Sequence, residues 1–249
     1  WWQGSFTHFY SLPSHALRHT VEKDLDALRR VGIQPTGDER KLVLVPGEAA
    51  QQRVAALMSQ HQLEPRRFLH LHPTSRWMFK SWPEEKVADL INALGKEGHR
   101  IVITAAPAAR EKATVARIVA LLKTPVVDLT GELSLAELAA LTARARLFVG
   151  VDSAPMHIAA SQGTPVVALF GPSGEAEWGP WMVPHRVVVA NEFACRPCGQ
   201  DGCGGGKLSE CLTALPVTRV LAAVNELLAE SGSAMPTKAL HLTHLLKTI

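Results

Sequence analysis

Residues 72–83 (HPTSRWMFKSWP) gather hydroxyl and cationic side chains directly after an apolar run. Thr74 and Ser75 offer hydroxyl donors, and Lys80 adds a compact positive charge in the same stretch. Donors grouped around a cation suit the oxygens of a diphosphate. The alternative is a solvated loop in which the lysine extends its charge into water.

Residues 151–160 (VDSAPMHIAA) carry the strongest chemical signal in the chain. Asp152 and Ser153 follow an apolar run, and the residues after them are typical of a helix that packs closely on a sheet. The first turn of a helix has unpaired N–H groups and a partial positive charge, so it favours an anion. The alternative is that Asp152 and Ser153 only cap the helix, although a cap does not account for His157 one turn later.

Neither stretch is a G-x-G-x-x-G loop or a P-loop, so no motif supports a dinucleotide oxidoreductase or a kinase. A further cluster has the pattern C-x2-C-x4-C-x7-C and comprises Cys195, Cys198, Cys203 and Cys211. Two close cysteines followed by two more suit a structural zinc site, but the later spacings are irregular. Free thiols, zinc and a disulfide remain open, with free thiols favoured. Three histidines near predicted strand ends, His70, His72 and His185, are each interpreted as structural.

These residues need a scaffold, and the sequence from residue 41 onward alternates strand-like and helix-like segments. The predicted strands are residues 42–45, 68–72, 99–105, 126–129, 147–151, 165–170 and 185–189. The predicted helices are residues 20–31, 49–61, 83–95, 108–122, 134–145, 156–162 and 216–229. Ser134 and Glu137 form a capping-box pattern at one helix start.

Wholly apolar strands such as IVIT, LFVGV and VVALF predict a parallel sheet covered by helices on both faces. The fold class is therefore α/β, a Rossmann-like doubly wound sheet, over residues 36–230. In such a sheet, ligands bind beyond the carboxyl ends of the strands, where both polar stretches are placed.

The two ends of the chain differ from this central domain. Five of the chain's fourteen aromatic residues lie within residues 1–10. They indicate either a disordered or tag-derived end or, as we prefer, a segment that packs on a preceding domain. We assign residues 1–35 to a leader with a connecting helix and residues 231–249 to a tail.

The composition is that of an ordinary soluble α/β protein, with 47% hydrophobic and 20% charged residues. The net charge of +3 is spread along the chain, which suits an anionic small ligand or membrane surface and argues against nucleic acid. No apolar run reaches the roughly 18–20 residues of a membrane span. The first residues do not resemble a signal peptide, so a cytoplasmic protein is expected.

Together, residues 72–83 and 150–173 resemble the C-terminal domain of glycosyltransferase family nine, the lipopolysaccharide heptosyltransferases. The pattern CRPC…C…SECL after them and residues 19–33 (HTVEKDLDALRRVGI) resemble the heptosyltransferase III-type branch. The resemblance covers roughly residues 15–230. It implies a GT-B architecture of two Rossmann-like domains, the second of which binds most of the ADP-heptose donor without a bound metal. It also implies inverting transfer of heptose to the lipopolysaccharide inner core, at the cytoplasmic face of the inner membrane.

The resemblance also assigns roles to individual residues. Thr74, Ser75 and Lys80 would contact the diphosphate, and Asp152 would bind sugar hydroxyls. The helix start after Ser153 would surround the phosphates with Ala154, Pro155, Met156 and His157. Ala154 departs from the glycine of most family members, and its methyl group limits how closely the backbone and a ligand approach.

Two further assignments follow from the resemblance. Leu133, in the loop Gly131-Glu132-Leu133-Ser134, would form the apolar wall of an adenine site. Glu111 would bind the ribose hydroxyls, or else it is a solvent-facing residue of the helix predicted at residues 108–122.

The chain also departs from the family pattern. Members begin with a domain whose Gly-Asp loop supplies the general base, and no such loop is found here. The sequence therefore predicts the donor-binding half of the enzyme, with the catalytic base in a missing N-terminal domain. The alternatives are a non-catalytic nucleotide-sugar-binding module, which an absent base supports, and a zinc-stabilised interaction domain, which only the cysteines support.

Overall fold

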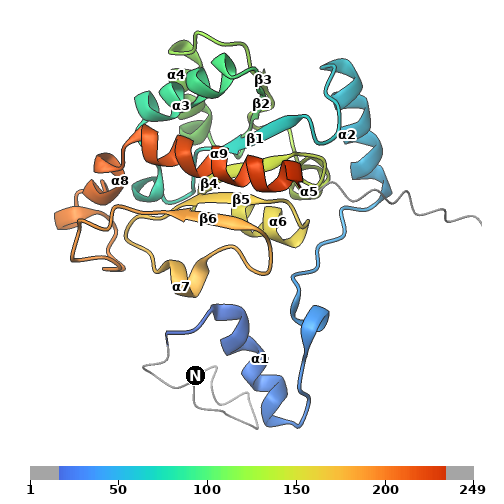
Figure 1. The fold of residues 1–249 in the computed structure, drawn as a ribbon, viewed down its shortest axis with the longest axis vertical. Helices are drawn as coiled ribbons and strands as arrows, with labels where there is room; N and C mark the ends of the chain where they lie inside the picture. Colours follow the sequence, from blue (N-terminus) through green and yellow to red (C-terminus); the bar gives the residue numbers. More distant parts are fainter. Residues whose placement is uncertain (1–16, 234–249) are drawn as a thin grey trace, which may run out of the picture.

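The computed structural model describes residues 17–233, and its core is the predicted α/β domain (Figure 1). Within that range, six strands form one sheet in the order β3-β2-β1-β4-β5-β6, and each neighbouring pair is parallel. The strands are β1 (Phe68–His72), β2 (Arg100–Ile103), β3 (Val127–Asp128), β4 (Leu147–Val151), β5 (Val166–Leu169) and β6 (His185–Val188). All six lie within or match predicted strands, and β4 and β5 are the continuous apolar runs expected of buried parallel strands.

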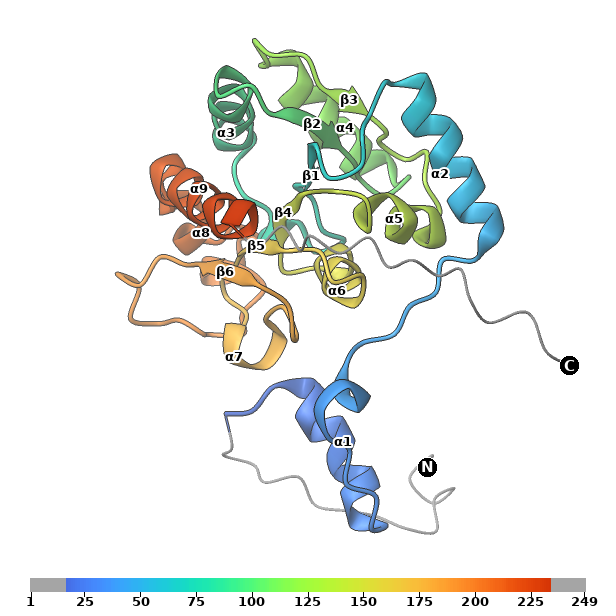
Figure 2. The ribbon, with the colours of Figure 1, turned by 45° about the vertical axis from the view of Figure 1, so that its right-hand side comes forward.

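Helices cover both faces of this sheet, as Figure 2 shows in a view turned from Figure 1. One face carries α3 (Glu84–Lys96), α4 (Ala109–Ala120) and α9 (Val217–Ser233). The other carries α2 (Glu48–Gln60), α5 (Leu135–Thr142) and α6 (Ala154–Ser161). The sequence analysis does not predict the short elements η2 (Gly37–Arg40), η3 (Met78–Lys80), α7 (Glu175–Trp178), η4 (Cys203–Gly205) and α8 (Glu210–Ala214).

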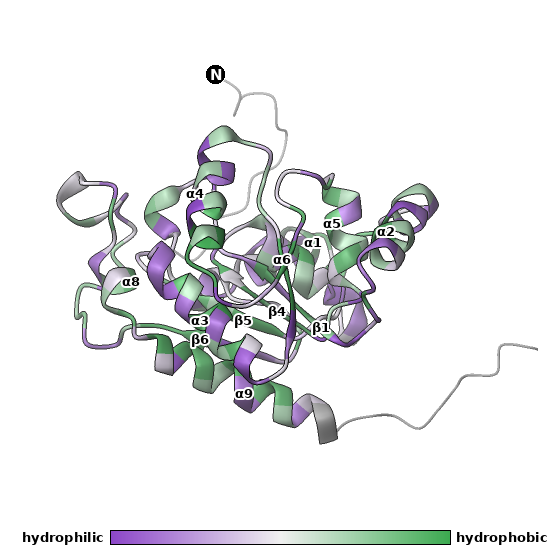
Figure 3. Cartoon of the chain, turned by 90° about the horizontal axis from the view of Figure 1, so that it is seen from above, coloured by the Kyte–Doolittle hydropathy of each residue, from purple (hydrophilic) through white to green (hydrophobic). Residues whose placement is uncertain are grey.

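The strands divide their side chains between two hydrophobic layers. On β1, Leu69 and Leu71 pack in the layer of α3, α4 and α9, whereas Phe68 packs with α2 and α5. This alternation follows from the two-residue period of a strand. Figure 3 shows the central strands in hydrophobic colours, with hydrophilic and hydrophobic residues alternating along α3 and α9. His70 lies in the second layer, on the same side of the sheet as Phe68, and its ring meets Phe148 edge-on at 5.1 Å.

Helix α1 (Thr20–Arg30) confirms the helix predicted at residues 20–31, and it lies apart from the sheet beside α7 (Figures 1 and 2). His19, the N-cap residue of α1, contacts the domain, because its Nε2 lies 2.9 Å from the carbonyl oxygen of Gly179 and its ring lies 4.4 Å from that of Trp181. Lys23 of α1 forms an ion pair with Glu177 of α7. A polar contact surface therefore joins α1 to the domain.

The strand predicted at residues 42–45 is wrong. This stretch is extended but pairs with no strand in the described structure, and Val43 and Val45 are 83% and 77% exposed. Its valines satisfy β-propensity, but a strand forms only where a neighbour accepts its hydrogen bonds. The aromatic residues of positions 1–10 and most of the predicted tail, residues 234–249, lie outside the described residues.

The strand order fixes where a ligand can bind. The chain runs from β1 outward through β2 to β3, then returns to β4 on the opposite side of β1. Loops that leave β1 and β4 therefore diverge and open a crevice at the carboxyl ends of these strands. Residues 73–83 follow β1 and residues 152–153 follow β4, so the sheet brings the two polar stretches to this crevice.

Candidate functional site

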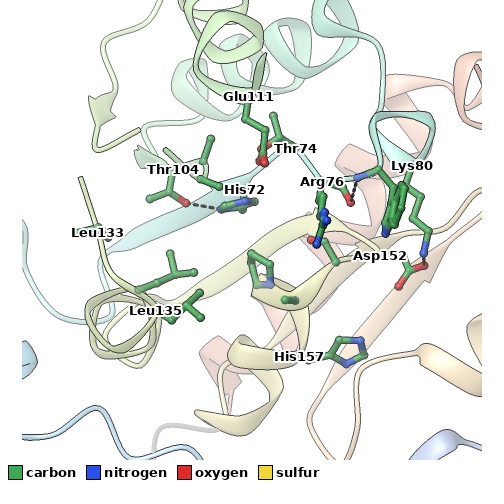
Figure 4. Close-up of a pocket in the computed structure, with 18 of the residues that line it drawn as sticks. His72, Thr74, Arg76, Lys80, Thr104, Glu111, Leu133, Leu135, Asp152 and His157 are labelled. Atoms are coloured by element: carbon green, nitrogen blue, oxygen red, sulfur yellow. Dashed lines mark hydrogen bonds and ion pairs between the residues drawn. The ribbon is translucent and has the colours of Figure 1, made fainter. Parts of the chain in front are cut away.

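A pocket of about 710 Å³ opens at the carboxyl ends of β1, β2 and β4 (Figure 4). This volume is within the usual range for small-molecule sites. The predicted site residues that line it are Thr74, Ser75, Lys80, Glu111, Leu133, Asp152, Ser153, Ala154, Pro155 and His157. Met156 does not, because its side chain is buried in the core beside Phe148.

Lys80 and Asp152 form an ion pair inside this pocket, with the Lys80 Nζ 2.6 Å from the Asp152 Oδ2. The side chains are 23% and 7% exposed, so the pair is shielded but reachable from the pocket. The turn η3 presents Lys80, since its N–H donates to the Trp77 carbonyl at 2.8 Å. The alternative of a lysine that extends into solvent is therefore wrong.

Thr74 and Glu111 form a second pair, deeper in the pocket. The Thr74 hydroxyl donates to the Glu111 Oε2 at 2.7 Å, and Glu111 is only 6% exposed. Glu111 lies in the first turn of α4, where the positive end of the helix favours a carboxylate. The alternative of a solvent-facing Glu111 is therefore wrong.

The start of α6 borders the pocket beside Asp152. Ser153 is the N-cap, but its hydroxyl donates to the Val151 carbonyl at 3.2 Å and makes no cap hydrogen bond. Since Asp152 pairs with Lys80, the alternative that these two side chains serve only as caps is also wrong. Pro155 has no N–H, and the N–H of Met156 donates to the Ser153 carbonyl at 3.0 Å. Ala154 is thus the residue of this turn best placed to offer its N–H to a ligand.

His157 lies one turn into α6 and faces the pocket near Lys80 and Asp152 (Figure 4). Burial lowers the pKa of His157, and the charges of His19 and Lys80 lower it further, while Asp152 acts in the opposite direction. The side chain is therefore neutral at pH 7 and can accept or donate a hydrogen bond.

The other end of the pocket is apolar. Leu133, Leu135 and Leu138 line it from the α5 side, opposite Lys80 and Asp152 (Figure 4). Leu135 is 67% exposed, which is high for a leucine that lines a pocket. The predicted capping box fixes the start of α5, since the Ser134 N–H donates to the Glu137 carboxylate at 2.7 Å and the Glu137 N–H donates to the Ser134 hydroxyl.

A profile of glycosyltransferase family 9 (heptosyltransferase) matches residues 6–208 of this sequence. The chain belongs to glycosyltransferase family 9. This confirms the resemblance found in the sequence and agrees with the strand order of the domain.

Individual family 9 proteins show the same relationship. Lipopolysaccharide heptosyltransferase 3 of Escherichia coli strain K12 is 32% identical over 239 residues, which cover 96% of this chain and 67% of that protein. The crystal structure of a family 9 glycosyltransferase from Veillonella parvula covers 91% of this chain and 64% of its own, with 24% identity and a TM-score of 0.75. The structure of E. coli ADP-heptose lps heptosyltransferase II covers 78% and 54%, with 26% identity and a TM-score of 0.61. This family 9 chain thus spans about two thirds of the length of its relatives or less.

The family 9 pocket also contains residues that the sequence analysis does not assign to it. Arg76 and Trp77 line its polar end, with the Arg76 guanidinium 5.7 Å from the centre of the Trp77 ring. His72 and Thr104 line its floor, and Trp178 of α7 lines its rim. Arg76 and Trp77 belong to residues 72–83, which the sequence analysis selected for other side chains. Their proximity to Lys80 in the sequence is the signal that could have identified them. Thr104 and Trp178 give no sequence signal of their own.

The four cysteines lie away from this pocket and are all free thiols. No group of three or more histidine, cysteine, aspartate or glutamate side chains among residues 17–233 is arranged to bind a metal. Burial raises the pKa of the Cys211 thiol, so this side chain is protonated at neutral pH in the metal-free chain. Within the described residues, the four cysteines are therefore not arranged as the ligands of one zinc ion. In the same range, no helix is long and apolar enough to cross a membrane.

Proposed function

We propose that this chain forms the donor-binding part of a heptosyltransferase that uses ADP-heptose in lipopolysaccharide core synthesis. The observation that carries the proposal is the order of groups along one pocket. An apolar wall, a hydroxyl–carboxylate pair and an ammonium group follow one another, as the base, ribose and diphosphate do in a nucleotide sugar. The similarity to E. coli ADP-heptose lps heptosyltransferase II supports the choice of donor.

The base and ribose would occupy the half of the pocket near α4 and α5. Leu133 and Leu135 offer an apolar surface to one face of a planar base. Glu111 already accepts one hydrogen bond from Thr74, and its second oxygen remains for a ribose hydroxyl. A carboxylate is suited to hydroxyl donors and unsuited to phosphate oxygens, which it repels.

The diphosphate would lie between η3 and the start of α6. Lys80 supplies the positive charge, Ser75 supplies a hydroxyl, and the first turn of α6 adds the N–H of Ala154 and its partial positive charge. In this arrangement the diphosphate draws Lys80 away from Asp152. Asp152 is then able to accept hydrogen bonds from hydroxyls of the transferred sugar.

These groups stabilise the leaving diphosphate, which gains negative charge as the bond to the sugar breaks. An inverting transfer also requires a base that removes the proton of the acceptor hydroxyl. In this arrangement the carboxylates that line the pocket, Asp152 and Glu111, both serve the donor, one for the transferred sugar and one for the ribose. We therefore place the base outside the pocket, in a further domain of the enzyme.

The acceptor in this proposal is the lipopolysaccharide inner core, which places the enzyme at the cytoplasmic face of the inner membrane as a peripheral protein. A second candidate function is a non-catalytic nucleotide-sugar-binding module. The assignment of both pocket carboxylates to the donor favours it, because Glu111 for the ribose and Asp152 for the transferred sugar leave neither for the acceptor hydroxyl.

Titration calorimetry with ADP, UDP, GDP and ADP-heptose tests the donor assignment. ADP should bind more tightly than UDP or GDP, and ADP-heptose more tightly than ADP. A ligand at about 100 times its dissociation constant should add about 2.7 kcal/mol to the free energy of unfolding. No thermal shift with millimolar ADP, in a chain shown to be folded by circular dichroism, contradicts the assignment.

A transfer assay with ADP-heptose and purified acceptor tests the placement of the base. The chain of 249 residues should bind the donor without transferring heptose. Turnover by this chain alone would require a base among the residues that line the pocket, and His157 would be the first to examine.

A further inference from the structure

Four buried side chains connect the floor of the pocket to α5 through consecutive hydrogen bonds. The His72 Nδ1 lies 2.9 Å from the Thr104 Oγ1, which lies 2.8 Å from the His70 Nε2. The His70 Nδ1 in turn lies 3.0 Å from the Thr142 Oγ1. Since alternate residues of a strand share a face, β1 presents both histidines on the same side of the sheet. We call these four side chains the histidine–threonine relay.

The hydrogen atoms of the relay can be assigned in only one way. The Thr142 Oγ1 lies 2.6 Å from the Leu138 carbonyl oxygen, which can only accept, so the single hydroxyl hydrogen of Thr142 points there. The His70 Nδ1 must then carry a hydrogen and donate it to Thr142. A neutral imidazole has one N–H, so the His70 Nε2 is an acceptor.

The same argument continues to the pocket. Thr104 must donate its hydroxyl hydrogen to the His70 Nε2, and its oxygen then accepts a hydrogen bond from the His72 Nδ1. Burial lowers the pKa of His72 to about 4 and that of His70 to about 3, so both rings are neutral at pH 7. The Nε2 of His72 is left with a lone pair, and the described residues provide it with no donor.

We propose that His72 is a specificity-determining residue whose Nε2 accepts a hydrogen bond from a hydroxyl group of the bound nucleotide sugar. Thr104, His70 and Thr142 are positioning residues that hold this ring in one tautomer. A lone pair repels phosphate oxygens, which are acceptors themselves, so His72 favours a hydroxyl over the diphosphate. His72 lies between the apolar wall and Lys80 (Figure 4). A nucleotide sugar bound along the pocket carries hydroxyl groups on its ribose and on the transferred sugar, and either kind is a candidate donor to His72. The choice of ligand rests on the proposed function, whereas the tautomer does not.

The tautomer is tested first, by nitrogen-15 NMR of the histidine rings in the full chain without ligand. His70 and His72 should both carry hydrogen on Nδ1 at pH 7. Thr104→Val keeps the side-chain shape and removes the hydroxyl, so His72 should then populate both tautomers. Thr104→Ser should restore the single form. A hydrogen on Nε2 of either histidine in the unmodified chain overturns the proposal.

The ligand group is tested by calorimetry with His72→Phe, which keeps a planar ring and removes the acceptor. If His72 accepts from the ribose, binding of ADP should weaken roughly tenfold in His72→Phe. The deoxy analogue that lacks the contacted hydroxyl, which is either 2′-deoxy-ADP or 3′-deoxy-ADP, should bind the variant and the unmodified chain equally well. If it accepts from the transferred sugar, only ADP-heptose should bind more weakly. An equal loss for all four ligands, or no loss for any, overturns the proposal.

Two further comparisons keep the test decisive. If His72→Phe does not fold, Thr104→Val replaces it and should give the same pattern among the ligands with a smaller loss. If the unmodified chain binds none of the ligands, the proposed function fails together with the hydroxyl assignment. The NMR measurement then decides the relay alone.

Discussion

The two sides of the pocket use polar groups in opposite ways. On the floor, His72, Thr104 and Glu111 are buried, and internal hydrogen bonds fix each of them. At the polar end, Lys80 and Asp152 satisfy each other through one ion pair, and Lys80 keeps contact with solvent. Buried networks of satisfied hydrogen bonds are rigid, whereas the attraction within a shielded ion pair is largely offset by the desolvation of its two charges.

This difference indicates two tasks. The floor is arranged before a ligand arrives, so it can select the ligand by the positions of its donors and acceptors. The polar end holds two charges that a ligand can separate at low cost, because the phosphate replaces Asp152 as the partner of Lys80. One pocket of about 710 Å³ thus contains a floor whose hydrogen bonds are fixed in advance and a polar end whose ion pair a ligand can replace.

The largest expected effect is the loss of stability in acid, and it comes from the floor. Burial lowers the pKa of His70 to about 3 and that of His72 to about 4, well below the ordinary value of 6.5. Between about pH 6.5 and 4 the unfolded chain therefore binds protons that the folded chain does not. Stability should fall with decreasing pH in this window, by about 1.4 kcal/mol per pH unit for each histidine.

Urea unfolding at several pH values between 7 and 4.5 measures this slope. His72→Gln removes one of the two groups, so the slope of the variant should be smaller by about 1.4 kcal/mol per pH unit. Burial also lowers the pKa of His157, which adds to the slope in the same direction in both proteins. Equal slopes in the variant and the unmodified chain would show that the floor does not exclude protons.

The next effect concerns the polar end. Lys80→Ala should weaken the binding of ADP and ADP-heptose alike, by about 1.5–3 kcal/mol, the range for a hydrogen bond to a charged group. Part of this loss arises because Asp152 becomes an unpaired carboxylate close to the diphosphate. The double variant Lys80→Ala/Asp152→Asn should recover that part, and calorimetry on the four proteins measures it.

Lys41→Ala is the matched control, because Lys41 also pairs with an aspartate, Asp38, but is exposed and lies outside the pocket. It should leave the affinity for both ligands unchanged. Unchanged ADP affinity in Lys80→Ala would remove the diphosphate from the neighbourhood of η3.

A smaller effect, which differs between the two ligands, is expected for Asp152→Asn. Loss of the carboxylate frees Lys80, so ADP should bind as well as before or more tightly, by up to about 1 kcal/mol. ADP-heptose should lose about 1 kcal/mol relative to ADP, because the amide is a weaker acceptor for sugar hydroxyls. Equal losses of affinity for both ligands contradict a sugar-binding role of Asp152. Equal gains of affinity would show that Asp152 serves only as the partner of Lys80.

The sequence predicted the central strands β4 and β5 because each is an apolar run between turn residues. It failed at residues 42–45, where valines suggested a strand but the fold provides no neighbour. The short helices η3 and α7 were not predicted either, because one or two turns give no periodic pattern. These short elements present Lys80 and Trp178 to the pocket.

The site was predicted by residue type but not by pairing. Residue types and spacing identified Lys80 and Asp152 as separate groups, and the family resemblance assigned Lys80 to the phosphates and Asp152 to the sugar. Their ion pair joins residues 72 positions apart, and it depends on β4 returning beside β1, which an alternation of strands and helices does not specify. The same limit applies to His70 and His72, which were interpreted singly as structural, since Thr104 reaches them only through the pairing of β1 with β2.

The smallest expected effect tests whether the start of α6 belongs with the fixed floor or with the exchangeable end. Ala154 lines the pocket, and its methyl group limits how closely a ligand can approach the backbone there. Ala154→Gly should allow phosphate oxygens closer to the backbone and tighten ADP binding by less than about 1 kcal/mol, at a cost to helix stability of about 0.5–1 kcal/mol or less. Calorimetry and thermal unfolding of the same variant separate the two effects. Ala159→Gly, in the same helix but buried in the core, is the control and should lower stability without tightening ADP binding. If Ala154→Gly lowers stability and leaves ADP affinity unchanged, the diphosphate does not approach the backbone of α6, and the polar end of the pocket reduces to the Lys80–Asp152 pair and its neighbouring hydroxyls.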